Sequence, residues 1–329
     1  MSGEKRRQRQ NAVNATFVST TRVQAAFARI DKLVDEGWAD DFCLALLMFG
    51  PSGSGKTRIV REWTKSRAAK AEKEGGALNV VVVEVPPGCT LKSMASELLM
   101  VLGCPKPDYG SQTERTRRVA ELAELNKVDL IVFDEIQRLI DVDSHKVKKD
   151  VANWLTGLLN RRVCPLLLVG EPHAELIFQG DDAGQKNIYL ERRTMGEVPI
   201  TPYDWNDLQA RLEFRSILHV LDQELGMPER SDLGSVETAL RIHAFTHGRV
   251  GLVTRLLSEA KRIAQAAGLS RVTKDTLADA VDVLRIGSDK QEPNPFRMET
   301  VMPGGPKPLH VRDDDERLPR RRATKRGAV

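Results

Sequence analysis

The sequence has few cysteines, few aromatic residues and no long apolar run. Its four cysteines, Cys43, Cys89, Cys104 and Cys164, are scattered and form no C-x-x-C pair, so we expect a fold that needs neither disulfides nor a structural zinc ion. No segment reaches the apolar length needed to span a bilayer, and no signal-peptide pattern follows the basic N-terminus. These absences lead us to expect a cytoplasmic protein with no membrane partner.

Charge of one sign is only in small excess, because 50 Lys and Arg oppose 46 Asp and Glu and leave a formal net charge of +4. The overall field is therefore a weak argument for a polyanionic partner. Basic residues do crowd both ends of the chain, where they either contact phosphate backbones or remain solvated. They are Lys5, Arg6, Arg7 and Arg9 near the N-terminus and Arg317, Arg320, Arg321, Arg322, Lys325 and Arg326 near the C-terminus.

Short apolar runs alternate with helical patterns as far as Ile200. Such alternation implies right-handed crossovers, a parallel sheet, and ligands at the carboxyl ends of the strands. The fold class that we predict is α/β, a parallel sheet sandwiched by helices. The predicted strands are 44–49, 78–85, 129–133, 165–169 and a short one that ends near Ile200, and the predicted helices are 56–73, 90–102, 111–126 and 146–161.

The character of the sequence changes after Trp205, where strand patterns stop and amphipathic helices follow at 207–225, 235–247, 249–267 and 274–285. We interpret these helices as a small α-helical lid. From Gly287 the chain has little apolar periodicity and many prolines, glycines and charges. The expected organisation is a basic N-terminal arm at 1–15, an α/β domain at 16–205, a helical lid at 206–286 and a disordered or partner-ordered basic tail at 287–329.

Residues 50–57 read GPSGSGKT, a full match to G-x-x-x-x-G-K-[ST], and they lie between a predicted strand and a predicted helix. Glycines let backbone amides converge on phosphate oxygens, and the helix N-terminus adds positive potential. In this pattern Lys56 reaches the β- and γ-phosphates and Thr57 ligates Mg²⁺, so we expect ATP and Mg²⁺ as cofactors. The nucleotide-binding candidates are Gly50, Pro51, Ser52, Gly53, Ser54, Gly55, Lys56, Thr57 and the following Arg58.

Two acidic residues follow the strand predicted at 129–133. Asp134 lands at the carboxyl edge of the sheet beside the phosphate loop, where it can hold Mg²⁺ together with Thr57. Glu135 is placed to polarise the water that attacks the γ-phosphate. We therefore predict an ATPase site in which Lys56, Asp134 and Glu135 are catalytic.

Together these motifs resemble those of P-loop AAA+ ATPases, and more narrowly the TniB/TnsC group of transposition regulators, to which the phage Mu B protein and IstB-type helpers are related. The resemblance covers about residues 15–286. It implies the AAA+ version of the α/β fold, followed by the lid. The residues that carry it are GPSGSGKT at 50–57, LIVFDEIQRL at 130–139, CPLLLVGEP at 164–172, LERRT at 190–194 and HGRVGLVTRLLSEA at 247–260.

The resemblance also implies residues that complete the nucleotide site. AAA+ proteins usually place Asn, Thr or Ser after the fourth strand, whereas this chain has Gly170-Glu171, so Glu171 either orients water or has a structural role. Arg193 and Arg192 match the arginine-finger region, with Arg193 the first candidate. A finger that acts across a subunit boundary implies that an isolated subunit hydrolyses ATP slowly and that assembly accelerates it.

The predicted lid departs from the AAA+ pattern at its sensor. AAA+ lids often carry an arginine in a G-x-x-R pattern, whereas Gly248 is followed three places later by Gly251. Arg249 or Arg255 would then take this role, and Arg249 is our candidate for the nucleotide site. Coupling between lid and nucleotide would consequently be looser than in proteins that carry the pattern.

Relatives of the TniB/TnsC group assemble as ATP-bound rings or spirals around duplex DNA and touch its backbone from the region after the second strand. The implied partners are further copies of the chain, double-stranded DNA, a transposase and a target-selection factor. Positive and hydroxyl groups suit phosphate contact without base specificity, and they are also typical of a solvated helix face. The candidates are Thr90, Lys92, Thr113, Arg115, Arg117 and Arg118, with a second, lower-ranked cluster at Lys146, Lys148 and Lys149.

Our leading hypothesis is an ATP-dependent regulator of transposition that oligomerises on target DNA and recruits or activates a transposase. Asn294-Pro295-Phe296 and the terminal basic cluster form a candidate docking segment for the transposase or a targeting factor. One alternative is a helicase loader or replication initiator with the same ATPase body, although no helix-turn-helix follows the lid to read origin sequence. The other is a nucleotide-switched scaffold whose oligomers are indifferent to DNA.

Overall fold

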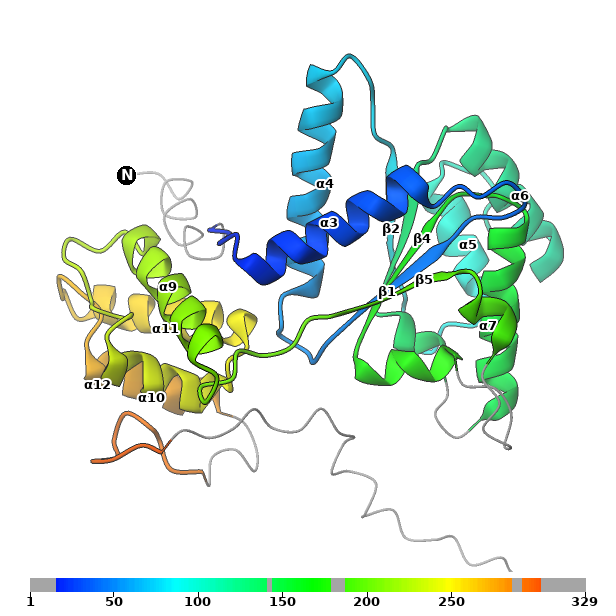
Figure 1. Ribbon diagram of the computed structural model, residues 1–329. Coiled ribbons are helices and arrows are strands. Elements are labelled where there is room, and N and C mark those ends of the chain that lie inside the picture. The colour runs from blue at the N-terminus through cyan, green and yellow to red at the C-terminus, as the bar shows by residue number, and fades with distance from the viewer. Residues whose placement is uncertain (1–15, 141–143, 179–186, 286–291, 303–329) are drawn as a thin grey trace, which may run out of the picture.

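The structure, a computed structural model, describes residues 16–140, 144–178, 187–285 and 292–302. Its centre is a sheet of five parallel strands in the order β2-β3-β4-β1-β5 (Figure 1). The predicted parallel sheet of an α/β fold is thereby confirmed. The strands are β1 (Ala45–Phe49), β2 (Val80–Glu84), β3 (Leu130–Asp134), β4 (Leu166–Gly170) and β5 (Thr194–Pro199).

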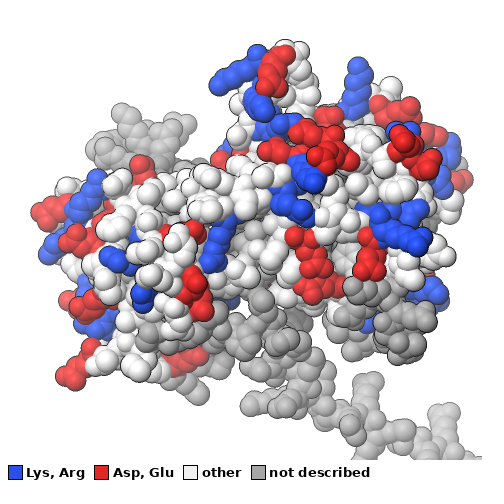
Figure 2. Space-filling model, viewed as in Figure 1, with Lys and Arg blue, Asp and Glu red and all other residues white. Residues whose placement is uncertain are grey.

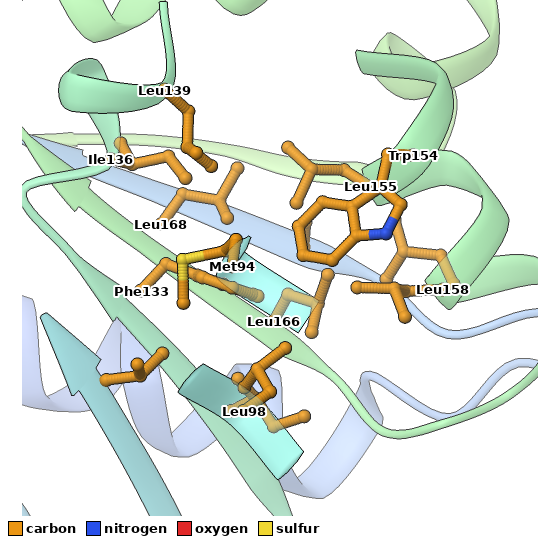
Figure 3. Packing of buried hydrophobic residues seen from close by; sticks show 14 of the residues in the cluster. Met94, Leu98, Phe133, Ile136, Leu139, Trp154, Leu155, Leu158, Leu166 and Leu168 are labelled. Atoms are coloured by element: carbon orange, nitrogen blue, oxygen red, sulfur yellow. The ribbon is translucent and has the colours of Figure 1, made fainter. Parts of the chain in front are cut away.

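Helices cover both faces of the sheet, so every residue of the central strands β1, β3 and β4 is buried. Alternate side chains of these strands belong to two apolar clusters, one on each face. Figure 3 shows the cluster in which Phe133 and Leu166 of the sheet meet Leu98 of α5 and Trp154 of α7. One face packs against α3 (Thr21–Glu36) and α4 (Lys56–Lys73), and the other against α5 (Leu91–Val101), α6 (Gln112–Leu125) and α7 (His145–Asn160).

The helix α3 is an element that the sequence patterns did not predict. It begins after Thr20, whose hydroxyl caps the helix. Asp31 of α3 accepts a hydrogen bond from the indole N–H of the buried Trp63 in α4 (3.0 Å). Just before α3, Val18 packs against the apolar core of the lid. The N-terminal segment therefore connects the sheet domain to the lid.

Three short helical segments follow or precede strands: η1 (Ile136–Leu139) after β3, η2 (Pro172–Phe178) after β4, and α8 (Ile188–Glu191) before β5. Segments this short show no amphipathic period in the sequence. Because η1 and η2 follow directly on strand ends, their side chains lie at the carboxyl edge of the sheet.

Four further helices form a second body beside the sheet, joined to it by the segment after β5 (Figure 1). They enclose an apolar core of their own, in which Phe214, Leu218 and Leu256 are fully buried. Each agrees with a predicted lid helix to within one residue at either end. None of the helices that the structure describes combines the length and apolar character needed to cross a bilayer. The four are α9 (Leu208–Glu224), α10 (Val236–Thr246), α11 (Val250–Ala266) and α12 (Lys274–Leu284).

Residues 292–302, which fall within the expected tail, pack against these helices. The buried guanidinium of Arg241 in α10 donates to three carbonyl oxygens of the segment. Asn294 and Phe296 are themselves buried, so the prediction of an accessible docking segment at Asn294-Pro295-Phe296 is wrong. The terminal basic cluster and the N-terminal arm at 1–15 lie outside the described residues, which alone are coloured by charge in Figure 2.

Candidate active site

The loop 50–57 leaves β1 at the carboxyl edge of the sheet and passes into α4. Gly53 and Gly55 have φ angles of 77° and 98°, which glycine adopts without the strain that a side chain would add. The ammonium group of Lys56 is buried and donates to the carbonyl oxygens of the first two loop residues (2.7 and 3.2 Å). The loop therefore surrounds the ammonium group of Lys56, which is the one cationic side chain of the motif.

The start of α4 and the end of β3 are joined by a hydrogen bond of 2.7 Å from the hydroxyl of Thr57 to Oδ2 of Asp134. Burial raises the pKa of Asp134, and the bond from Thr57 opposes this rise. Burial lowers the pKa of Lys56, while the carboxylates of Glu135, Glu171 and Asp134 oppose the decrease. The site therefore gathers hydroxyl and carboxylate oxygens, the donors that Mg²⁺ prefers, around one buried ammonium group.

Glu135 turns the chain out of the sheet in a conformation that few residues other than glycine adopt (φ 60°, ψ 37°). Its backbone N–H donates to Oδ1 of Asp134 (3.0 Å), and its Oε2 accepts a hydrogen bond from Nε2 of Gln137 (2.7 Å). Backbone outliers of this kind concentrate at functional sites, where surrounding contacts hold them in place. The two acidic residues that the sequence predicted thus lie together at the end of β3.

The last residue of β4 is Gly170, so the strand itself ends without a polar side chain, and the carboxylate of Glu171 follows where Asn, Thr or Ser was expected. Gln137 of η1 lies beside this strand end, and its Oε1 accepts a hydrogen bond from the backbone N–H of Glu171 (3.1 Å). A Cβ atom at Gly170 would lie 2.7 Å from that Oε1, so glycine is needed for the close approach. Gln137 was not predicted as a site residue, and its only signal in the sequence is its place within the DEIQRL motif.

An apolar cavity of about 210 Å³ opens beside the loop, between the sheet domain and the lid. Its walls come from residues 16–23, from residues 199–203 at the end of β5 and just beyond it, and from α9 and α11. Phe17, Arg58 and Tyr203 are among the lining residues. Apolar walls beside a phosphate-binding loop suit a nucleoside base. Sequence reasoning missed this wall because it placed no element at residues 16–36.

The lid touches the loop directly at Gly251. Its backbone N–H donates to the carbonyl oxygen of Gly53 (2.8 Å), and a Cβ atom at Gly251 would lie 2.7 Å from that oxygen. This close approach explains why glycine stands where a sensor arginine was expected. Of the two substitutes, Arg249 occupies the N-cap position of α11 with its Nε donating to the carbonyl oxygen of Thr246 (3.3 Å), and Arg255 is exposed.

The two finger candidates differ in their surroundings. Arg193 donates to Oδ1 of Asn160 (2.6 Å) and to the carbonyl oxygen of Tyr189 (2.8 Å), and its guanidinium lies over the ring of Phe42 (4.8 Å to the centroid). Arg192 caps the C-terminal end of α8 and is exposed. The residue favoured from sequence is therefore engaged within its own subunit, and its neighbour is the more accessible of the pair.

Four of the six predicted DNA-contact residues are exposed on or near α5 and α6. Two of them also act within the fold, because Thr90 caps α5 and Arg117 pairs with Glu121. Their polar groups nevertheless remain accessible to a phosphate backbone. The four are Thr90, Lys92, Thr113 and Arg117.

The other two residues hold the loop at 103–110. Arg115 is 8% exposed, and its guanidinium donates to the carbonyl oxygens of Gly110 (3.0 Å) and Asp108. Arg118 donates to two more carbonyl oxygens of this loop (2.9 and 3.0 Å). This geometry corrects the prediction of a DNA contact at Arg115, since a buried guanidinium bound by loop carbonyls is not open to a phosphate. Lys148 of the lower-ranked cluster is buried as well.

Comparisons with known proteins agree with this architecture. The family model described as "Bacterial TniB protein" matches residues 9–187, whereas none of the curated proteins compared with the chain matches it. The solved structures to which the chain is similar include the Aeropyrum pernix ORC1 protein in complex with DNA, with 20% identity over 82% of this chain and 68% of that one and a TM-score of 0.60. They also include the Aeropyrum pernix ORC2 protein in ADPNP-ADP complexes (15%, 83% and 71%, 0.59) and Cdc6p from Pyrobaculum aerophilum (15%, 84% and 72%, 0.62).

At these identities the likeness to solved structures establishes the fold, which is that of AAA+ P-loop ATPases. The family match is a separate finding, because it rests on the sequence and includes the loop 50–57 and the pair Asp134-Glu135. This match covers more than half of the chain, so the chain belongs to the TniB family.

Proposed function

We propose that this protein binds ATP with its triphosphate on the loop 50–57 and its base in the neighbouring apolar cavity, and that it hydrolyses the bound ATP. The observation that carries the proposal is the 2.7 Å contact between Thr57 and Asp134 beside the buried Lys56. The ORC2 protein of similar fold was solved in ADPNP-ADP complexes, which supports a nucleotide as the ligand.

Each polar group of the site has a distinct task in this proposal. Thr57 and Asp134 would hold Mg²⁺, which neutralises charge on the phosphate oxygens when bound. Lys56 would exchange its bonds to loop carbonyls for bonds to the β- and γ-phosphates. Glu135 would accept a hydrogen bond from the attacking water and orient it towards the γ-phosphorus.

We further propose that the ATP-bound protein oligomerises on duplex DNA and there regulates transposition by recruiting or activating a transposase. Membership of the TniB family supports the link to transposition, and the ORC1 structure with DNA supports a DNA partner for this fold. The backbone contacts would come from the exposed Thr90, Lys92, Thr113 and Arg117. An arginine that follows α8, Arg192 or Arg193, would complete the site of the neighbouring subunit.

Nucleotide binding is tested by replacing the lysine of the loop. We expect Lys56→Ala to abolish ATP hydrolysis and the rise in thermal midpoint that ATP and Mg²⁺ produce in the unchanged protein. Lys65→Ala is the matched control, because Lys65 lies on the same helix and is exposed. Full nucleotide affinity and activity in Lys56→Ala would refute the proposed site.

The DNA role is tested by measuring duplex binding with ATP, with ADP and without nucleotide over a range of salt concentrations. We expect binding that requires ATP, ignores sequence and weakens steeply with salt, as phosphate contacts do. Nucleotide-driven oligomers that ignore added duplex would instead indicate a scaffold without a DNA role. Selective binding of a replicative helicase or of origin sequence would favour the loader or initiator alternative.

A further inference from the structure

Two adjacent side chains of η1 tie together the carboxyl ends of three strands. Gln137 bonds to Glu135 after β3 and to the backbone of Glu171 after β4. Arg138 donates to Oε1 of Glu84 (2.8 Å) at the end of β2 and lies 3.6 Å from the carboxylate of Glu135. The candidate catalytic carboxylate is therefore contacted at Oε2 by the side chains two and three positions after it in sequence.

The contacts of Gln137 leave one orientation for its amide. Its Nε2 donates to Oε2 of Glu135, and its Oε1 accepts from the N–H of Glu171. A flipped amide would set oxygen against a carboxylate oxygen and N–H against N–H, so both bonds would be lost. Gln137 is only 7% exposed, which means that unmade bonds could not be replaced freely by water.

The surrounding backbone is shaped to admit this amide. The left-handed conformation of Glu135 turns the chain sharply, so that Gln137 returns to the side of the carboxylate. Gly170 leaves room for Oε1, which a Cβ atom would approach to 2.7 Å. A strained residue and a close glycine contact on either side of one buried amide indicate that its position matters to the site.

We propose that Gln137 is a positioning residue that orients the carboxylate of Glu135 towards the attacking water. It also links the orientation of that carboxylate to the position of the backbone at the end of β4. The inference rests on the proposed ATP hydrolysis and adds to it the group that orients Glu135. Gln137 donates to Oε2 of Glu135, and the guanidinium of Arg138 lies 3.6 Å from the same oxygen, so Oε1 is left for the water.

In the reaction the water oxygen forms a bond to the γ-phosphorus, and the bond from that phosphorus to the β–γ bridging oxygen breaks with its electron pair going to ADP. One proton of the water passes to the carboxylate of Glu135. Gln137 takes no proton and touches no reacting atom. Its contribution is the geometry of the carboxylate, which sets how well the water is aligned.

The test compares full-length Gln137→Leu, Gln137→Glu, Glu135→Gln and the double variant Glu135→Gln/Gln137→Leu with the unchanged protein. The first removes both amide contacts, whereas Gln137→Glu keeps the shape and the acceptor for Glu171 but sets an oxygen against Glu135. The measurements are ATP affinity and the rate of hydrolysis with saturating ATP, Mg²⁺ and duplex DNA, with single-turnover assays for slow variants. Gln265→Leu, at an exposed glutamine of α11, is the control.

We expect each Gln137 variant to lower kcat by about tenfold or more while ATP affinity stays within about threefold, because the residue acts on the chemical step. The double variant should be no slower than Glu135→Gln alone, since Gln137 acts through Glu135. A purely structural role would instead slow hydrolysis further in the Glu135→Gln background.

Unchanged kcat in both Gln137 variants, or additive losses in the double variant, would overturn the inference. Gln137→Glu decides the matter if Gln137→Leu fails to fold, because it retains the size and one of the two bonds. An unchanged protein that binds ATP without hydrolysing it would refute the proposed ATPase function itself, a result that is visible before any variant is compared.

Discussion

Gly251 at the start of α11 donates its backbone N–H to the carbonyl oxygen of Gly53, over 2.8 Å. The lid is therefore joined to the phosphate loop at this point by a main-chain hydrogen bond. Gly248, three residues earlier, adopts a φ of 72° and would place a Cβ atom 2.1 Å from the carbonyl oxygen of Tyr203. Both glycines of the G-x-x-G pattern are thus required by close backbone approach, which makes lid and loop one continuous wall of the cavity.

Replacing Gly251 by alanine should push the lid away from the loop. The new Cβ atom would lie 2.7 Å from the carbonyl oxygen of Gly53, and relieving an overlap of this kind typically costs about 1–3 kcal/mol. If bound nucleotide needs the closed wall, the dissociation constant for ATP should rise about 5- to 150-fold. Titration with a fluorescent ATP analogue measures the change.

The matched control for this substitution is Gly157→Ala. Gly157 lies inside α7, and an added Cβ atom there meets nothing within 4 Å. Alanine favours a helix interior over glycine by about 1 kcal/mol, so we expect an unchanged or slightly raised thermal midpoint and unchanged ATP affinity. Equal ATP affinity in Gly251→Ala and Gly157→Ala would show that the lid contact does not contribute to the nucleotide site.

Arg115 and Arg117 are two residues apart on α6 and should respond to substitution in opposite ways. Arg115→Ala removes the buried guanidinium that binds carbonyl oxygens of the loop at 103–110, which should destabilise the fold by about 2–3 kcal/mol. Arg117→Ala removes an exposed charge and should leave the free energy of unfolding nearly unchanged. Denaturant titration of both variants checks this contrast.

The same pair of variants bears on DNA binding. Loss of one phosphate contact at Arg117 should weaken duplex binding about equally for all sequences and reduce the salt-dependence slope by roughly one. Thr113→Ala, which removes an exposed hydroxyl but no charge, is a control that should leave the slope unchanged. A slope that is identical in Arg117→Ala and in the unchanged protein would remove Arg117 from the proposed DNA surface.

The buried His243 should make the lid sensitive to mild acid. Its Nε2–H donates to the carbonyl oxygen of Tyr203 (2.7 Å), its Nδ1 is buried without a hydrogen-bond partner among the described residues, and burial lowers its pKa below the ordinary value of 6.5. As the pH falls through 6.5, His243 takes up a proton in the unfolded chain but stays neutral in the folded lid. The folded state is therefore fully stable with respect to this group above pH 6.5 and progressively loses stability below it.

Thermal midpoints between pH 7.5 and 5.5 measure the effect. We expect the midpoint to fall with pH more steeply in the unchanged protein than in His243→Gln, which has no titrating group at this position. The raised pKa of Asp134 acts in the opposite direction in both proteins, so it cancels in the comparison. His219→Gln, at an exposed histidine of α9, should keep the steep dependence. Equal slopes in His243→Gln and the unchanged protein would contradict the prediction.

Much of the fold could be predicted from sequence because its signals are local. The helix α4 begins at Lys56, where the phosphate motif requires a helix, and ends just before Gly75-Gly76. The Ser111 and Glu114 side chains make both bonds of the predicted capping box at the start of α6. The strands could be predicted for the same reason, because each is a short apolar run that ends at a turn or at acidic residues. Each of these patterns is complete within one segment of the chain.

The rest depends on contacts between distant segments. In α3 the buried residues Ala26, Ile30 and Leu33 do follow a helical spacing, but the flanking polar residues mask it. The cavity joins Phe17 to residues around Tyr203, more than 180 positions away, and no local pattern reports such a contact. The burial of Arg115 likewise depends on how α6 packs on the preceding loop. This packing is not visible in the sequence, where the charge of Arg115 suggested a surface role.

The arginine pair after α8 supports a final prediction, in which the finger is Arg192 and Arg193 is structural. The guanidinium of Arg193 is bound by Asn160 and Tyr189 of its own subunit and covers the ring of Phe42, so Arg193→Ala should lower the thermal midpoint. Arg192 is exposed and free to approach a neighbouring phosphate loop. Arg192→Ala should therefore slow hydrolysis by the assembled protein about 10³-fold or more without changing ATP affinity.

Mixing two inactive variants tests whether the finger acts across a subunit boundary. Lys56→Ala subunits lack a working loop but retain Arg192, and Arg192→Ala subunits retain the loop. When the two are combined on duplex DNA with ATP, intact loops next to intact fingers occur at some boundaries, so part of the activity should return. Full activity of Arg192→Ala by itself would exclude this residue as the finger. A mixture as inactive as its components would show that the arginine serves its own subunit, since no combination of separate subunits could then restore a complete site.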